Sequence, residues 1–520
     1  MKNLSIGIQT FEDLIQNNCI YVDKTEIIYN LLQGPGVGKA VYFLSRPRRF
    51  GKSLLISTLE NIFLGNKEVF KDCWIYTSNF AWDKHPIFRL NFSEMSFNSV
   101  ENFELDLIEK LHQIAKKNSI NLDKQKTIAS KTGTLIEEMA KTKQVVILVD
   151  EYDYPLISNI HRLNVAQDIR ETLKSFYNVI KNADRYIKSV FITGVSKFSK
   201  VSIFSGMNNL IDLTINESSA LLLGYTQQEL EHYFCDYIDQ TAKRLSLDKK
   251  DLLLEIKNQY NGYKFHRTGE TVYNPFSVQL FFMSCEFENY WFESGTPTFL
   301  IDLLKKNNYP VANIDQCKLS QDDLGKIELE NIKFFTLLFQ TGYVTIKAYN
   351  VKTKNYELSY PNEEVRQAFS SQIIEAMTKL PSAQLNEFIE QFRQFLANGD
   401  MNAFCENMYT FFAKVPYMIQ IPIEHYYQSL FFVVMSMLGA DIDIEKPTNV
   451  GRMDAVIENE TYVYIFEFKF NKPVKEAIEQ IFEKKYFEGY KNKPKKIVVI
   501  GMTFNLDKRN LQSDWEIKEL

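Results

Sequence analysis

The strongest constraint on the fold comes from the first 215 residues, in which short apolar runs alternate with helical patterns. Four of these runs have the length and composition of buried strands, and they cover residues 40–44, 87–92, 145–149 and 189–193. Between them, residues 52–64 and 102–117 repeat apolar side chains at helical spacing. Strands that alternate with helices predict a parallel α/β sheet.

The pattern becomes mostly helical from about residue 226. Two segments, 260–265 and 272–276, are rich in turn-forming residues and are expected to be irregular. Farther along, residues 342–346 and 356–360 have the pattern of a hairpin. A hairpin that follows helices indicates a small winged-helix-like module.

The last hundred or so residues form a second α/β pattern. Helices are expected at 424–438 and 474–485, and strands at 452–457, 462–470 and 496–500, after long helices from 363 to 414. At roughly 150 residues per domain, the length of the chain corresponds to about 3.5 domains. We expect four regions: an N-terminal α/β domain (1–215), a helical lid (216–300), a helical or winged-helix region (301–404) and a C-terminal α/β domain (405–520).

Charge and cysteine content exclude several classes of protein. The chain has 60 Lys and Arg against 65 Asp and Glu, a net charge of −5, so no overall positive charge indicates a nucleic-acid partner. The six cysteines are scattered and form no Cys-x-x-Cys pair. This argues against a disulfide framework and against a zinc site, and it fits a reducing compartment.

No targeting or membrane segment is expected. Glu12 and Asp13 lie where a signal peptide would need an apolar core. The longest apolar run, residues 430–440, is interrupted by Ser436 and is far shorter than the ~18–20 residues of a membrane span. We therefore expect a soluble, cytoplasmic protein with no membrane partner.

A phosphate-binding loop is indicated by Gly51-Lys52-Ser53, which follows an expected strand and opens an expected helix. The helix N-terminus would offer N–H groups to a phosphate. Lys52 would reach the β- and γ-phosphates, and the Ser53 hydroxyl would bind Mg²⁺. The leading glycine of the usual pattern is replaced by Arg46.

Other residues near this loop are less specific. Arg48 and Phe50 are assigned to the ATP site with the loop, although Arg48 and its neighbour Arg49 could equally lie in solvent. A glycine-rich segment just upstream, residues 34–40, precedes a strand rather than a helix, and Ala40 cannot bind a metal ion. We interpret this segment as a turn.

The run at 145–149 ends in Asp150 and Glu151, as a Walker B strand does. Asp150 would hold Mg²⁺, often through water, and Glu151 would orient or deprotonate the attacking water. The alternative is an acidic pair at a helix N-terminus. The order and spacing of the two motifs favour a nucleotide site. Thr193, at the end of the next expected strand, is a candidate sensor beside the γ-phosphate.

Several motifs together resemble the AAA-ATPase-like family of prokaryotes, relatives of the STAND-type P-loop ATPases. They are YVDKT (21–25), SRPRRFGKS (45–53), LVDEYD (148–153), ITGVSKFSK (192–200) and YNGYKF…VYNPF (260–276). The resemblance covers roughly residues 5–300. This family typically carries arginines where others have glycines, so Arg46 is a family trait. The resemblance implies ATP at Gly51, Lys52 and Ser53, with Asp150 and Glu151 at the metal ion and the water.

A second candidate site lies near the C-terminus. Asp454 is in one expected strand, and Glu467 and Lys469 share one face of the next, after a turn near Asn459. Two carboxylates that share a site repel each other, and a divalent cation relieves this repulsion. A lysine beside them can position water and stabilise the negative charge on a phosphate. A Glu-x-Lys on a strand is most often an exposed ion pair. Here the flanking residues are apolar, so a charged pair needs a reason for its burial.

The arrangement Asp454-x12-Glu467-x-Lys469 resembles the PD-(D/E)xK nuclease superfamily over about residues 405–520. The resemblance implies that Glu424 in the preceding helix and Gln480 in the following helix join the site, although Met453 replaces the common proline. C-terminal PD-(D/E)xK domains accompany the AAA-ATPase-like family. His425 is interpreted as a surface or capping residue rather than a metal ligand.

We therefore expect an α/β protein with a P-loop NTPase parallel sheet, a helical lid with a winged-helix-like element and a C-terminal restriction-endonuclease-like domain. Its expected function is an ATP-binding and ATP-hydrolysing, Mg²⁺-dependent or Mn²⁺-dependent DNA nuclease, with ATP gating cleavage or assembly into a homo-oligomer, in mobile-element or defence biology. The alternative is a STAND-like switch whose C-terminal domain binds nucleic acid or a partner without cleaving. The lysines at 484–485 and 491–496 would contact phosphate or form a solvated turn.

Overall fold

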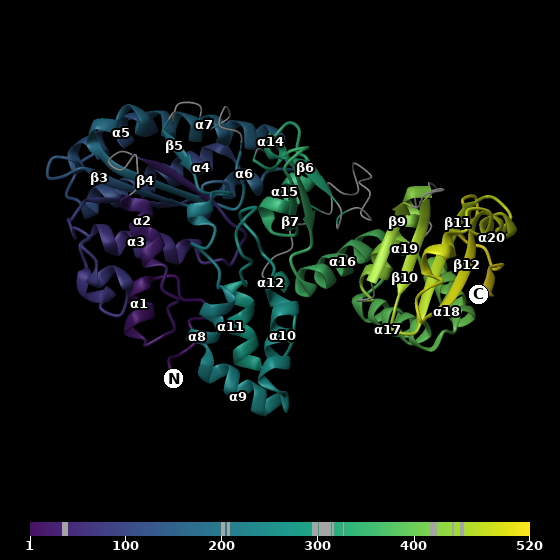
Figure 1. Cartoon of the computed structure of the whole chain (residues 1–520). Coiled ribbons are helices and arrows are strands. Elements are labelled where there is room, and N and C mark those ends of the chain that lie inside the picture. Colours follow the sequence, from purple (N-terminus) through teal and green to yellow (C-terminus); the bar gives the residue numbers. More distant parts are fainter. Residues whose placement is uncertain are drawn as a thin grey trace. The chain divides into compact units, whose positions relative to one another are not determined.

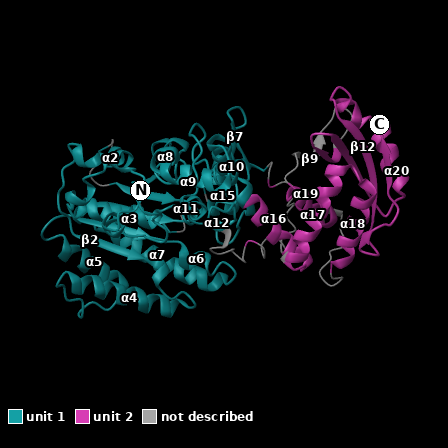
Figure 2. Cartoon of the chain, turned by 90° about the horizontal axis from the view of Figure 1, so that it is seen from below, with its two compact units in different colours: residues 1–295, 316–364 teal, residues 296–315, 365–520 magenta. Residues whose placement is uncertain are grey.

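The computed structural model describes residues 1–33, 40–198, 203–204, 209–293, 300, 314, 317–325, 327–415, 424–438, 441–447 and 452–520. The chain forms two compact units, one of residues 1–295 and 316–364 and the other of residues 296–315 and 365–520 (Figure 2). The boundary that we expected at 404–405 falls inside helix α18 (Met401–Lys414), which packs against α17 (Ser382–Asn398). Those two helices therefore belong with the C-terminal sheet.

The first unit contains a five-stranded parallel sheet in the order β2-β3-β4-β1-β5. Its strands are β1 (Val41–Ser45), β2 (Ile87–Asn91), β3 (Val145–Asp150), β4 (Ile187–Gly194) and β5 (Leu210–Asp212). The parallel sheet and its four expected strands are confirmed, and β5 is an addition. Because β4 lies between β1 and β3, the carboxyl ends of these three strands meet at one edge.

Helices cover both faces of this sheet, as the fully buried strands β1 and β3 require. Figure 1 shows α5 (Ile128–Met139) and α7 (Leu163–Asn182) on one face, and α2 (Thr25–Gln33) and α3 (Lys52–Phe63) on the other. Helix α4 (Val100–Lys117) packs with α5 and α7. It buries Phe103, Leu107, Leu111 and Ala115, which recur every four residues along one face.

A second core of the same unit is helical. It is formed by α8 (Gln227–Tyr233), α9 (Cys235–Leu245), α10 (Lys249–Tyr260) and α11 (Pro275–Ser284), together with Ile20 and Val22. Between α10 and α11, the two turn-rich segments form isolated bridges, Tyr263 with Val272 and Tyr225 with Tyr273. The shorter helices of the unit are α1 (Phe11–Gln16), α6 (Tyr154–Ile157), α12 (Tyr290–Glu293) and α14 (Gln321–Leu324).

The expected winged-helix-like hairpin is present but begins later than we expected. Helix α15 (Phe334–Thr341) is followed by β7 (Thr345–Asn350) and β8 (Asn355–Ser359), which pair with β6 (Lys318–Ser320) in the order β6-β8-β7. Gly342, which we placed in the first strand, instead ends α15 with a φ of 92°. A Cβ atom at this position would lie 2.6 Å from Pro47, so the glycine allows close contact with the loop after β1.

The second unit contains a mixed sheet in the order β13-β12-β11-β10-β9, with β14 paired to β12. Its elements are α16 (Glu363–Thr378), α17, α18, α19 (Glu424–Ser436), β9 (Asp441–Pro447), β10 (Arg452–Glu458), β11 (Tyr462–Phe470), α20 (Val474–Glu483), β12 (Lys496–Asn505), β13 (Asn510–Leu511) and β14 (Glu516–Glu519). The expected helices and strands are confirmed, whereas β9, β13 and β14 were not expected.

The two faces of the central strand β11 have different partners. Val463 and Ile465 pack with Ile478 and Ile481 of α20. The ring of Phe466, on the other face, lies near Phe404 of α18 and Phe431 of α19 (centroids 5.7 and 5.5 Å apart). Alternation therefore puts Glu467 and Lys469 on the face that α20 covers. Within the described ranges, no helix combines the length and apolar character that crossing a membrane requires.

Candidate nucleotide and nuclease sites

The loop between β1 and α3 contains a left-handed glycine and a buried lysine. Gly51 has a φ of 92° and directly precedes α3, a conformation that glycine adopts readily. The Lys52 ammonium donates hydrogen bonds to the carbonyl oxygens of Arg46 (3.1 Å) and Pro47 (3.0 Å). The lysine thus lies folded back into the loop, at the N-terminus of a helix that can receive a phosphate.

The charge of Lys52 is balanced from the end of β3. Lys52 is only 5% exposed, and burial lowers its pKa. The carboxyl groups of Glu151, Asp150 and Asp153 act in the opposite direction and favour the ammonium form. The structure therefore brings the lysine of the first motif close to the acidic residues of the second.

Asp150 is completely buried at the end of β3. Its Oδ1 accepts a hydrogen bond from the hydroxyl of Thr193 (2.5 Å) at the end of β4. Its buried Oδ2 has no hydrogen-bond partner among the described residues. An orphaned carboxylate oxygen is costly unless a metal ion or an ordered water satisfies it, so the residue suits the metal-binding role expected of it.

The two other acidic residues of this segment differ in their surroundings. Glu151 has a φ of 52° and lines a pocket, and burial raises its pKa. Asp153 is buried and accepts hydrogen bonds from the backbone N–H groups of Val195 (3.1 Å) and Ser196 (2.6 Å). Asp153 thus fixes the chain after β4, and Glu151 is the carboxylate that reaches the pocket.

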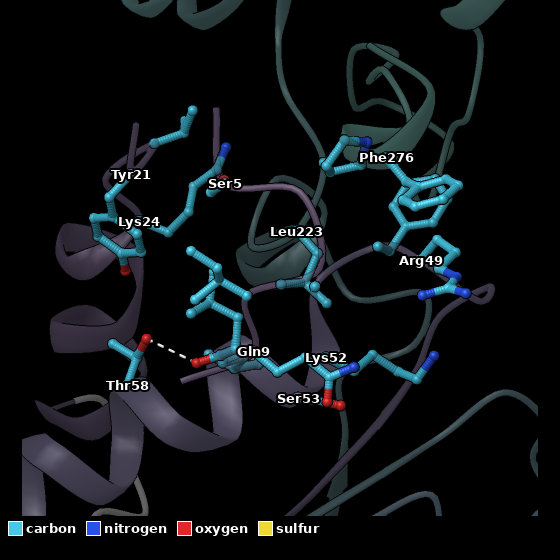
Figure 3. A pocket seen from close by; sticks show the side chains of 18 of the residues that line it. Ser5, Gln9, Tyr21, Lys24, Arg49, Lys52, Ser53, Thr58, Leu223 and Phe276 are labelled. Atoms are coloured by element: carbon cyan, nitrogen blue, oxygen red, sulfur yellow. Dashed lines mark hydrogen bonds between the residues drawn. The ribbon is translucent and has the colours of Figure 1, made fainter. Parts of the chain in front are cut away.

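The pocket beside the loop has a volume of about 450 Å³, within the range of about 300–1,000 Å³ that is usual for small-molecule sites. Its wall includes an N-terminal strip (5–9), residues between Ile20 and Ile28, the loop with the start of α3 (48–55), residues 222–225 and the start of α11. Figure 3 shows Lys52 and Ser53 on the same side as Arg49 and Phe276, with Tyr21 and Lys24 at the opposite end.

The residues assigned to ATP from the sequence fall into two groups. Arg48, Gly51, Lys52 and Ser53 line the pocket, as Glu151 does. Asp150 and Thr193 are buried behind the described part of the wall. Thr193, expected beside the γ-phosphate, donates its hydroxyl to Asp150.

Phe50 borders the pocket, but its ring belongs to the core. The side chain is 1% exposed. Its ring packs edge-on against Tyr263 (4.8 Å between centroids) and Phe265 (5.5 Å). Phe50 therefore anchors the loop to the turn-rich segment, which gives the YNGYKF motif a structural role. The glycine-rich residues 34–39, interpreted as a turn, lie outside the described residues.

Arg46, which replaces the usual glycine, is a buried residue that supports the loop through hydrogen bonds. It is 1% exposed, and its guanidinium donates hydrogen bonds to the carbonyl oxygens of Thr214 (2.7 Å) and Ser219 (2.9 Å). The group also lies 4.0 Å from the ring centroid of Phe265. Burial lowers its pKa to about 9, although Asp212 opposes the shift. The arginine thus ties the phosphate loop to the chain after β5.

Replacing Arg46 with alanine is expected to lower the free energy of unfolding by about 3 kcal/mol, because buried carbonyl oxygens lose a charged donor. Thermal unfolding followed by circular dichroism measures this change. Arg185→Ala is the matched control, since that side chain is 75% exposed. An equal melting temperature for the two variants would show that the hydrogen bonds of Arg46 do not stabilise the fold.

Two parts of the pocket wall were not found from the sequence. Ser5 belongs to no motif, yet its backbone N–H and its hydroxyl both donate to Oε1 of Gln279 (2.7 and 3.0 Å). The amide of Gln279 donates in turn to the hydroxyl of Tyr225. Leu222 and Leu223 form the other missing part. The contact between Ser5 and Gln279 joins positions 274 residues apart, and no local pattern marks it.

In the second unit, the structure brings together four of the residues predicted for nuclease chemistry. Lys469 Nζ lies 3.0 Å from Glu467 Oε1 and donates to Gln480 Oε1 (2.6 Å). The Gln480 amide also donates to Glu467. Asp454 Oδ2 accepts the backbone N–H of Phe468 (2.7 Å), which places this carboxylate beside the same strand.

The turn between β10 and β11 explains why Asp454 of β10 lies beside Glu467 of β11. Asn459 Oδ1 accepts the backbone N–H groups of Thr461 (2.9 Å) and Tyr462 (2.7 Å), a side-chain-stabilised turn. The antiparallel pairing then runs to Ala455 opposite Phe466. Asp454 and Glu467 are the next residues outward on these two strands, so their side chains share a face.

Glu467 is an unusually placed carboxylate. It is 2% exposed, and burial, reinforced by the charge of Asp454, raises its pKa against the opposing effect of Lys469. Its Oε2 is buried without a hydrogen-bond partner in the described part of the chain. A surface ion pair would show none of this, whereas a carboxylate that awaits a cation would.

Not every expected residue can be placed at this site. Glu424 and His425 begin α19, but their side chains lie outside the described residues. No group of three or more His, Cys, Asp or Glu side chains suited to a metal ion occurs where the structure is described. Asp454 and Glu467 are the two carboxylates that the structure describes at this site, with Lys469 and Gln480 as polar neighbours of Glu467.

The basic segment after α20 is largely neutralised. Of its six lysines, Lys493 and Lys495 pair with Glu458, Lys496 pairs with Glu519 and Lys485 with Glu488. Exposed pairs of this kind contribute little to stability. The pairing favours the solvated turn over a phosphate-binding surface.

Comparison with known proteins gives matches at both sites. The family described as predicted AAA-ATPase matches residues 5–204, and the PD-(D/E)XK nuclease superfamily matches residues 423–514. An "Uncharacterized protein in vnfD 5'region" of Azotobacter chroococcum mcd 1 is 35% identical over 526 residues, which cover 98% of this chain and 98% of that protein. The Aeropyrum pernix ORC2 protein, solved with ADPNP and ADP, covers 70% of this chain and 90% of its own at 11% identity. The TM-score is 0.18, so this match says nothing about the fold of the chain.

Proposed function

Because the chain belongs to the AAA-ATPase-like family and has a C-terminal domain of the PD-(D/E)XK nuclease superfamily, we propose that it is an ATP-hydrolysing, metal-dependent DNA nuclease. The parallel sheet of the first unit and the mixed sheet of the second fit these two assignments. The observation that carries the nuclease proposal is the buried Glu467, which lies with an unpartnered oxygen beside Asp454, Lys469 and Gln480.

At the nucleotide site, the phosphates of ATP would lie against the N-terminus of α3. Lys52 would leave the carbonyl groups of Arg46 and Pro47 for the β- and γ-phosphates, and Ser53 and Asp150 would hold Mg²⁺. Glu151, which reaches the pocket, would orient the attacking water and accept its proton. The apolar side chains of Ile6, Ile8 and Leu222 suit the base.

At the nuclease site, Asp454 and Glu467 would hold Mg²⁺ or Mn²⁺. Such an ion polarises the scissile phosphate and lowers the pKa of a bound water. Lys469 would orient the water and stabilise negative charge on the phosphate. Gln480 holds the lysine and Glu467 together through its amide, so its contribution is to preorganise the site. Glu424 remains a candidate additional carboxylate.

The presence of both sites on one chain supports a further part of the proposal, that ATP gates cleavage or drives assembly into a homo-oligomer. A role in mobile-element or defence biology is compatible with this chemistry. In the alternative, a STAND-like switch, the C-terminal domain would bind nucleic acid or a partner without cleaving it. The intact set of Asp454, Glu467 and Lys469 favours catalysis.

The proposal is tested by incubating the full-length protein with plasmid and with single-stranded DNA, in Mg²⁺, in Mn²⁺ and in excess chelator, each with and without ATP. We expect metal-dependent cleavage that the chelator abolishes and that ATP changes. Nucleotide binding by the same preparation is measured by calorimetry. Protein that binds ATP but cleaves neither DNA under any condition would support the switch instead.

A further inference from the structure

A tryptophan of the first unit links the phosphate loop to a helix that continues into the second unit. The indole Nε1–H of Trp291, in α12, donates to the carbonyl oxygen of Arg48 (3.0 Å). The backbone N–H of the same residue donates to Oε1 of Glu364 (2.7 Å). Trp291 is 6% exposed and Glu364 is completely buried. One residue therefore bonds to the loop through its side chain and to Glu364 through its backbone.

Glu364 is unusual because it is completely buried, although an acidic residue at the beginning of a helix is itself common. It is the second residue of α16, and the boundary between the two units follows it directly (Figure 2). The Ser277 hydroxyl, in α11, donates to both of its carboxyl oxygens (3.0 and 2.9 Å). Burial raises the pKa of Glu364 to about 8, against the opposing effect of its donors. A buried carboxyl group of this kind is expensive to retain, and its bonds fix the start of α16 to α11 and α12.

Close backbone contacts leave little room for independent movement around this link. A Cβ atom at Gly262, in the YNGYKF motif, would lie 1.8 Å from the carbonyl oxygen of Pro361. On the other side, a Cβ atom at Gly342 would meet Pro47 of the phosphate loop at 2.6 Å. The ring of Trp291 lies beside Tyr343, 5.2 Å between centroids. The loop and the start of α16 are thus held by one tightly packed cluster.

The loop has an internal reason to change when phosphate binds. Lys52 holds the carbonyl groups of Arg46 and Pro47, and Pro47 directly precedes Arg48, whose carbonyl group receives the Trp291 indole. If Lys52 turns to a phosphate, the Pro47 carbonyl loses its donor, and the peptide units next to it are free to adjust. In a close-packed interior such an adjustment is passed to the neighbours in contact.

We infer that Trp291 and Glu364 are positioning residues that transmit occupancy of the phosphate loop to the start of α16, and through that helix to the nuclease unit. The inference rests on the proposed function, because it concerns how nucleotide controls the nuclease site. It gives the YNGYKF and VYNPF motifs a common role, since the first packs on Pro361 and the second precedes Ser277. Trp291 bonds to both elements, to the loop through its indole and to the start of α16 through its backbone N–H.

The test is Trp291→Phe, which keeps an aromatic ring but removes the indole N–H. Hydrogen exchange of backbone amides in residues 360–370 is measured with and without ATP and Mg²⁺. In the wild type, nucleotide is expected to change this exchange. In Trp291→Phe the change should be lost, while ATP affinity falls less than about tenfold, as for one neutral hydrogen bond. Trp515→Phe is the matched control, because its indole donates to Asn402 (3.2 Å), far from the loop in sequence.

The outcomes separate this inference from the proposed function. The inferred transmission from the loop to α16 is wrong if the wild type binds ATP but exchange at 360–370 does not respond. It is also wrong if Trp291→Phe responds as the wild type does, and in both cases nucleotide binding stands. If the wild type binds no ATP, the proposed function fails and the inference with it. Should Trp291→Phe not fold, a protein with phenylalanine at the other three tryptophans, Trp74, Trp82 and Trp515, decides the matter. The fluorescence of its remaining tryptophan, Trp291, should shift when ATP is added. An unchanged spectrum would contradict the inferred transmission.

Discussion

Glu467→Gln is expected to reduce metal-dependent DNA cleavage about 1,000-fold, which corresponds to about 4 kcal/mol of transition-state stabilisation. The substitution keeps the shape of the side chain and an oxygen that can accept from Lys469 and Gln480. It removes the negative charge and the unpartnered oxygen that would hold the cation. Cleavage of a plasmid, measured as an initial rate across a series of Mg²⁺ concentrations, gives the size of the loss.

The matched control for this prediction is Glu479→Gln. Glu479 lies on α20 next to Gln480, but its side chain is 61% exposed and pairs only loosely with Lys475, at 3.3 Å. This variant should cleave at the wild-type rate. Burial and the Asp454 charge raise the pKa of Glu467 despite Lys469, so the charged form is disfavoured and the neutral variant should also fold at least as stably as the wild type. Full cleavage by Glu467→Gln would remove the nuclease assignment.

The elements of the first sheet could be predicted because each of its main strands is a continuous apolar run. β5 was missed because it has only three residues and two of them are half-buried. The pocket wall shows a different limit. Lys52 and Ser53 are marked by a local motif, whereas Ser5 and Gln279 become neighbours only through the fold. A contact between residues so far apart leaves no trace in the spacing of either.

Arg46 and Phe50 show that a motif position does not reveal what a side chain touches. The sequence shows only that an arginine replaces a glycine and that an aromatic residue follows it. In the structure the guanidinium satisfies carbonyl groups after β5, and the phenyl ring packs into the turn-rich segment. Both residues shape the loop from behind, and this follows from burial, which a sequence motif does not record.

In the nuclease-like domain, the candidate site could be predicted for a simple reason. Its three charged residues lie on two consecutive strands joined by a short turn, so alternation and register alone bring them together. Gln480 lies one helix farther on and was placed by resemblance. Strands β9, β13 and β14 were missed because they are short or rich in charged residues, as edge strands often are.

Glu151→Gln is expected to lower the rate of ATP hydrolysis by about 100-fold or more, the usual contribution of a general base, while ATP binding is retained. The carboxylate lines the pocket beside Lys52, and the amide can still accept a hydrogen bond from water but cannot take its proton. Phosphate release gives the rate, and calorimetry gives the affinity. Glu137→Gln, on the exposed side of α5, is the control and should hydrolyse ATP normally.

The pH dependence gives this prediction a second readout. Burial raises the pKa of Glu151 above its ordinary value, so the fraction of base in the active, ionised form falls as the pH is lowered through that raised pKa. Hydrolysis by the wild type should therefore decline at a higher pH than an exposed glutamate would cause. The small residual rate of Glu151→Gln should lack this decline, because glutamine does not titrate. A variant with normal hydrolysis and the same acidic decline would show that another group acts as the base.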